Sequence, residues 1–184
     1  MSKFYDSLNP QLIQFIEKQH LFFVATAPLS SDGLINLSPK GLSNFKVINT
    51  HCVAYMDFIG SGNETSAHTL ENGRMTIMLC SFEKVPNILR LYGKGRAVLP
   101  ENQDWKSLSE NFTTYSSTRQ IIVLDIEKIQ TSCGYGVPQY QYQGERTQLF
   151  DWAEKKGNQG LQDYMVEKNQ KSLDGLPTHL AKGK

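Results

Sequence analysis

The fold class is decided by residues 88–99, which read ILRLYGKGRAVL. The Ile, Leu, Tyr and Val side chains favour a β-strand, and alternation places Ile88, Arg90 and Tyr92 on one face. Two glycines interrupt the run, which predicts a bulge or bend of the kind found at a barrel corner. These residues therefore predict a long, bent strand in a curved sheet.

The neighbouring segments predict further strands joined by short connections. We expect them over residues 21–27, 34–38, 45–48, 51–57, 74–81 and 119–129, with helices over 9–20, 65–72 and 103–112. Pro39-Lys40-Gly41 is expected to interrupt the chain after the second strand. Hairpin-length connections contradict a parallel βαβ sheet. The order of elements thus predicts a mainly β, antiparallel, barrel-like domain with short peripheral helices.

The character of the sequence changes after Thr131. Residues 132–138 are expected to form a loop, and two short helices are expected over 148–156 and 161–168. This region has too few apolar residues for a core of its own. We therefore expect residues 1–131 to form the barrel domain and residues 132–184 to be a loop and helical extension packed on it.

Composition and charge exclude several classes of protein. The 184 residues carry 19 Lys and Arg against 18 Asp and Glu, so neither nucleic acid nor an anionic membrane is an expected partner. Three cysteines without a CxxC pair argue against a disulfide framework and against a zinc site. No signal-peptide pattern opens the sequence. We expect a cytoplasmic protein.

The most informative segment for function is residues 60–68, GSGNETSAH. Its glycines allow a tight turn, its polar side chains offer donors, and the following helix presents unpaired N–H groups. Together these features are typical of a phosphate site. An ordinary helix start, capped by Asn63 or Thr65 and holding no ligand, accounts for the same residues.

Two cations are candidates to complete such a site. Lys40 follows Ser38-Pro39 at the end of a strand, where it either holds an anion or is simply solvated. Arg90 lies within an apolar run, so it either has a buried partner or reaches water at a barrel rim.

Few other side chains point to chemistry. His68 is expected to cap its helix or face solvent rather than bind a metal, and no metal site is expected. Cys133 has no neighbouring His or Lys to promote its thiolate. With no evident triad or carboxylate pair, the sequence indicates that a cofactor supplies the reactivity.

Several motifs together resemble the pyridoxamine 5'-phosphate oxidase-like family of flavin-binding split barrels. The resemblance covers roughly residues 8–130 and rests on residues 34–41, 55–57, 60–68 and 71–93. It implies a six-stranded antiparallel split β-barrel that forms a homodimer, with FMN in two clefts at the dimer interface. The tail resembles that of an uncharacterised subgroup.

The resemblance also implies which residues hold the flavin. Carried over position by position, cofactor binding falls to Ser38, Pro39, Lys40, Asp57, Ser61, Gly62, Asn63, Thr65 and Arg90. True pyridoxamine phosphate oxidases have an Arg-Lys pair in the phosphate loop and a C-terminal segment rich in Arg. Here Asn63 and Glu64 follow Gly62, and no Arg follows Arg146. Oxidation of vitamin B6 is therefore not expected.

We thus expect an FMN-dependent oxidoreductase that acts on a small-molecule substrate or electron acceptor. Tyr135 or Trp152 would cover the flavin ring or shape the substrate pocket. One alternative is a flavin-binding sensor or carrier without turnover. Another is a split barrel that binds deazaflavin F420 or haem, for which His68 and Cys133 are the candidate axial ligands.

Overall fold

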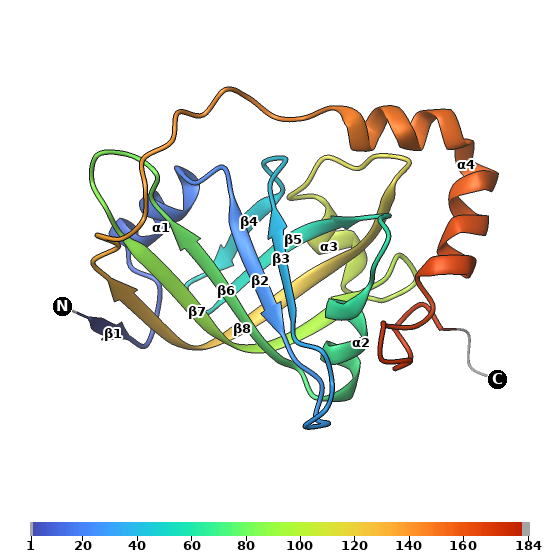
Figure 1. Cartoon of the computed structure of the whole chain (residues 1–184), viewed down its shortest axis with the longest axis horizontal. Helices are drawn as coiled ribbons and strands as arrows, with labels where there is room; N and C mark the ends of the chain where they lie inside the picture. Colours follow the sequence, from blue (N-terminus) through green and yellow to red (C-terminus); the bar gives the residue numbers. More distant parts are fainter. Residues whose placement is uncertain (1, 182–184) are drawn as a thin grey trace.

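The fold is an antiparallel split β-barrel followed by a C-terminal extension (Figure 1). The computed structural model describes residues 2–181. Its strands are β1 (Lys3–Tyr5), β2 (Phe22–Thr26), β3 (Asn36–Lys40), β4 (Phe45–Asn49), β5 (Cys52–Phe58), β6 (Arg74–Cys80), β7 (Ile88–Val98) and β8 (Thr118–Ser132). Its helices are α1 (Pro10–Glu17), α2 (Glu64–Glu71), α3 (Trp105–Ser109) and α4 (Gln148–Lys168).

One strongly curved sheet contains all the strands. Its order is β3-β2-β6-β7-β8-β5-β4, and β1 pairs with β8 away from this path. The pairs are antiparallel, as the short connections predict. The long strand β8 joins the two halves of the sheet, because it pairs with β7 on one side and with β5 on the other.

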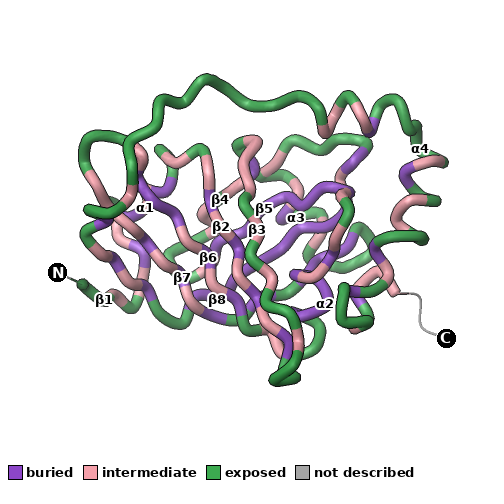
Figure 2. Tube along the Cα trace, viewed as in Figure 1, coloured by how far each residue is buried: buried purple, intermediate pink, exposed green. Residues whose placement is uncertain are grey.

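The barrel interior is the main hydrophobic core. Leu89 and Leu91 of β7 are fully buried there, whereas Arg90 between them is not, so the predicted alternation is confirmed. The predicted irregularity is also confirmed, since the register between β7 and β8 shifts at Tyr92/Gly93. Figure 2 shows this buried lining along the central strands.

Helices and the C-terminal extension cover the barrel. α1 begins at Pro10 because the Asn9 side chain accepts the Leu12 N–H at 2.9 Å, and its buried face closes one end of the core. A second cluster on the outer face of β5 and β8 packs against α3 and the start of α4. The two helices expected over 148–156 and 161–168 form the single element α4, which is kinked at Gly157, where φ is +65°.

Other differences from the expected elements are local. The strand β1 is not among the strands expected from the sequence. Its three residues show no apolar alternation, and they form a strand because they pair with β8. Pro39 and Lys40 do not interrupt the chain but belong to β3, an end strand where a missing N–H is tolerated. α3 is shorter than expected. Among residues 2–181, no helix combines the length and apolar character needed to cross a bilayer.

Candidate functional site

A buried ion cluster lies where β3, β5 and β8 meet. Lys40 donates to Oδ1 of Asp57 at 3.1 Å, and Arg119 donates to Oδ2 through Nη2 at 2.6 Å and Nε at 3.1 Å. Gln120 also donates to Oδ2, at 2.7 Å. We call Lys40, Asp57, Arg119 and Gln120 the Asp57 cluster.

The strand registers explain how these side chains meet. Lys40 pairs with buried Phe22, so alternation turns it inward, and Asp57 pairs with Gln120. The register between β5 and β8 then shifts, and Arg119 has no partner position on β5. Such a bulge re-aims a side chain, and it lets two consecutive residues of β8 reach one carboxylate.

The cluster holds Asp57 in its charged form. Burial raises the pKa of Asp57, but the positive charges of Arg119 and Lys40 and the Gln120 hydrogen bond outweigh it and lower the pKa to about 2. Two cations thus face one buried carboxylate, which leaves an excess of positive charge. The Lys40 side chain is 27% exposed and remains accessible from outside, whereas that of Arg119 is only 3% exposed.

The glycine-containing loop before α2 is tied to this cluster. Arg119 donates through Nη1 to the Gly62 carbonyl at 3.0 Å, and Gln120 donates to Oδ1 of Asn63 at 2.8 Å. Asn63 occupies the N-cap position of α2, yet its side chain makes no capping hydrogen bond. The Glu64 carboxylate lies against Gly62, so a side chain at position 62 would require Glu64 to move.

A second polar group extends the site toward the hairpin between β2 and β3. Asn36 donates to Thr26 Oγ1 at 3.0 Å and to Thr65 Oγ1 at 3.1 Å, and it accepts from Ser38 at 2.8 Å. His68 is fully buried and its Nδ1 lies 2.9 Å from Thr26 Oγ1, so the expectation that it faces solvent is wrong. Burial lowers the pKa of His68.

The structure brings part of the predicted site together. Two hydrogen-bond networks contain most of these residues. Lys40, Asp57, Gly62 and Asn63 are joined through Arg119 and Gln120, and Ser38 and Thr65 are joined through Asn36. Pro39 and Ser61 are exposed outside both networks. Arg90 lies on the outer face of the sheet, level with Met78 and Gln130, and donates to Ser132 Oγ at 3.2 Å.

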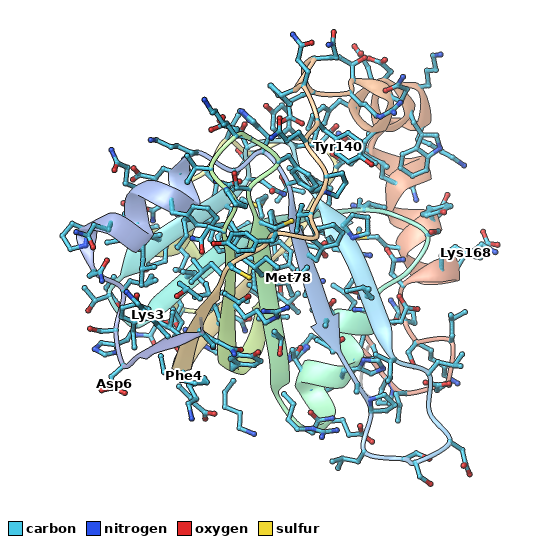
Figure 3. The ribbon with its side chains drawn as sticks, turned by 60° about the vertical axis from the view of Figure 1, so that its left-hand side comes forward. Lys3, Phe4, Asp6, Met78, Tyr140 and Lys168 are labelled. Atoms are coloured by element: carbon cyan, nitrogen blue, oxygen red, sulfur yellow. The ribbon has the colours of Figure 1, made fainter. Side chains whose placement is uncertain are left out.

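The residues expected to cover a flavin ring lie apart from each other. Tyr135 is 83% exposed, and Trp152 packs edge-on against Tyr164 within the C-terminal extension. A mostly apolar pocket of about 720 Å³ is instead lined by Phe23, Phe82, Tyr140 and Tyr142. In Figure 3, Tyr140, one of the residues that line this pocket, lies above the sheet face that carries Met78.

Sequence reasoning missed Arg119, Gln120 and Asn36. A signal exists for the first two: an Arg-Gln pair directly precedes the apolar run 121–124, so one or both must find partners when the strand is buried. Within the described residues, no group of three or more His, Cys, Asp or Glu side chains is placed to hold a metal ion.

Within one copy of the chain, His68 and Cys133 do not lie together. His68 contacts the end of β2 that pairs with the start of β6. Cys133 follows the end of β8 that pairs with the start of β7, at the other end of these strands.

Comparison with known solved structures agrees with this fold. Two structures of HupZ from Group A Streptococcus share 16% and 17% sequence identity with this chain, with TM-scores of 0.54 and 0.53. The similarity covers 67% and 66% of this chain and 98% and 91% of theirs. At this identity the likeness concerns the fold alone.

Sequence comparison is more specific. The family model described as "Pyridoxamine 5'-phosphate oxidase" matches residues 8–133. The "Pyridoxamine 5'-phosphate oxidase family protein ustO" of Aspergillus flavus is 39% identical over 194 residues, which cover 96% of this chain and 78% of that protein. The chain therefore belongs to the pyridoxamine 5'-phosphate oxidase family.

Proposed function

We propose that this protein is an FMN-dependent oxidoreductase that forms a homodimer and binds the flavin at the interface between two copies. The observation that carries the proposal is the excess positive charge of the Asp57 cluster beside the loop 60–63. Membership of the pyridoxamine 5'-phosphate oxidase family supports the same cofactor.

The donors at this site fit a phosphate group. The partly exposed Lys40 ammonium has three N–H donors and gives one to Asp57, so donors remain for an incoming oxygen. The N-terminus of α2 adds backbone N–H groups and the positive end of a helix dipole. The Glu64 carboxylate opposes an anion here, so binding requires its side chain to turn away from Gly62.

FMN, when bound, supplies the hydride or electron chemistry, and the chain's role is to bind and orient it. Lys40 contacts the phosphate, while Asp57 stays ionised and holds both Lys40 and Arg119 in place. Ser38 and Thr65 both hydrogen-bond to Asn36 and offer hydroxyl groups to the polar chain of the flavin.

The surface of the barrel supports a homodimer. Leu37, on the end strand β3, is 65% exposed, and Leu34 and Ile35 before it are also exposed. Exposed apolar side chains gathered at the end of a sheet mark a surface for association with another chain. Arg90 lies on the outer face of the sheet. It would therefore contact the flavin where the cofactor lies between the outer faces of two copies.

The first test is an absorbance spectrum of the purified protein and a titration with FMN, with the oligomeric state measured by light scattering. Saturation at one flavin per subunit in a dimer is expected. If no flavin co-purifies and none binds, the FMN proposal fails, and the mass of any extracted ligand then tests F420 and haem. Reduction by NADH or NADPH, followed by oxidation by an added acceptor, separates an enzyme from a flavin carrier.

The residue assignment is tested separately. Lys40→Ala and Arg90→Ala should each weaken FMN binding by about 1.5–3 kcal/mol, because each removes a charge-assisted contact. Lys106→Ala, which removes an exposed lysine of α3, is the matched control and should bind FMN normally. Unchanged affinity in the first two variants would reject these residues without rejecting the cofactor.

A further inference from the structure

We propose that the C-terminal segment 169–179 positions the loop 60–63 and, through it, the Asp57 cluster. Asn169 and Thr178 are the positioning residues. Figure 1 shows this segment, in red, beside α2. The family match ends at residue 133, so the segment is an addition to the shared barrel.

Asn169 contacts the loop at both of its ends. Its side chain is fully buried and donates through Nδ2 to the Gly60 carbonyl at 2.9 Å. Its own carbonyl accepts from Nδ2 of Asn63 at 3.1 Å and from Oγ1 of Thr178 at 2.7 Å. One residue of the tail therefore fixes the span between Gly60 and Asn63.

Further contacts hold the segment against neighbouring elements. The His179 N–H donates to Ser66 Oγ at 3.1 Å, in the first turns of α2. The Leu34 N–H donates to Oδ2 of Asp174 at 2.9 Å, in the hairpin between β2 and β3. The segment thus bridges the two parts of the chain that border the proposed phosphate site.

The Asn63 amide transmits this restraint to the cluster. Because its Nδ2 donates to the Asn169 carbonyl, its Oδ1 is directed to the Gln120 side chain. The Gln120 Nε2 group in turn donates to Asp57. A continuous buried path of hydrogen bonds therefore leads from Thr178 to Asp57, and loss of one partner removes one of the hydrogen bonds that fix the next polar group.

The experiment compares full-length variants that differ by one hydroxyl group. Thr178→Val keeps the shape of the side chain and removes the donor to Asn169, whereas Thr178→Ser keeps the donor. Ser172→Ala is the control, because the Ser172 hydroxyl accepts from the Leu176 N–H within the segment itself. Asn169→Ala is a second, more severe variant.

Amide hydrogen exchange over residues 60–66 is the first readout. We expect exchange to be about tenfold faster in Thr178→Val, with normal rates in Thr178→Ser and Ser172→Ala. Exchange in β7 reports global stability and should be unchanged. Equal loop rates in the wild type, Thr178→Val and Asn169→Ala would overturn the proposal.

The affinity for FMN is the second readout, and it alone rests on the proposed function. We expect about 3- to 10-fold weaker binding in Thr178→Val, restored in Thr178→Ser. Faster loop exchange without any loss of affinity would overturn the link to the cluster. If the wild type does not bind FMN but loop exchange responds as expected, the proposed function fails and the positioning role stands.

Discussion

The Asp57 cluster makes a sharp prediction about stability, because a matched arginine exists elsewhere in the chain. Arg119→Met removes a buried guanidinium that donates twice to Asp57 and once to the Gly62 carbonyl. Arg96→Met removes a guanidinium that lies 3.3 Å from Asp104, with both side chains largely exposed at 44% and 57%. The two variants lose the same chemical group but differ in burial.

The expected costs follow from that difference. Breaking a buried ion pair from one side costs about 3–5 kcal/mol, because the remaining charge stays desolvated. Lys40 and Gln120 remain on Asp57, so we expect the lower end of this range, about 3 kcal/mol, for Arg119→Met. An exposed pair contributes about 0–1 kcal/mol, which is the expected cost of Arg96→Met.

Urea unfolding measures both costs. All proteins are compared at one concentration, because association between copies would shift the apparent stability. Arg119→Met should lower the free energy of unfolding by at least about 2 kcal/mol more than Arg96→Met. Equal losses in the two variants would refute the reasoning that Arg119 and Asp57 are a buried pair in which removal of Arg119 leaves the Asp57 charge desolvated.

Two further predictions concern pH and backbone packing. The pKa of Asp57 falls from 3.8 to about 2 on folding, so its contribution to stability is complete above pH ~4 and is lost as pH falls toward 2. Stability should therefore drop by about 2 kcal/mol more over this window in the wild type than in Asp57→Asn; parallel curves would contradict the lowered pKa. Gly93→Ala should cost about 1–3 kcal/mol in thermal unfolding, because a Cβ at the bulge meets the backbone of β8 at Asp125. Gly136→Ala, where a Cβ meets nothing, is its control, and similar melting temperatures for the two variants would count against this packing.

Much of the barrel is predictable because its strands have clear apolar patterns. Alternation identifies the inner residues of β7, and two glycines mark its bulge. The short strand β1 has no such pattern, because pairing with β8 alone defines it. Patterns of period two thus predict strands that line a core and miss strands that only extend an edge.

The site is less predictable because it depends on register and on distant segments. The loop 60–68 and Lys40 are visible in the sequence, since their residue types suit an anion. The role of Arg119 requires the shift in pairing after Asp57, which only the assembled strands reveal. Asn169 lies more than a hundred residues from the loop that it contacts, and no local pattern links the two.

The position of β8 between β7 and β5 has a consequence for the order of events during synthesis. Every other strand of the barrel precedes it in the chain, so β2, β3, β6 and β7 form one partial sheet and β4 and β5 another until residues 118–132 emerge from the ribosome. Each partial sheet exposes an unpaired apolar edge during that interval. Nascent chains stalled before residue 118 emerges should therefore need chaperones and aggregate readily, whereas chains whose residue 132 has left the ribosome can close the barrel.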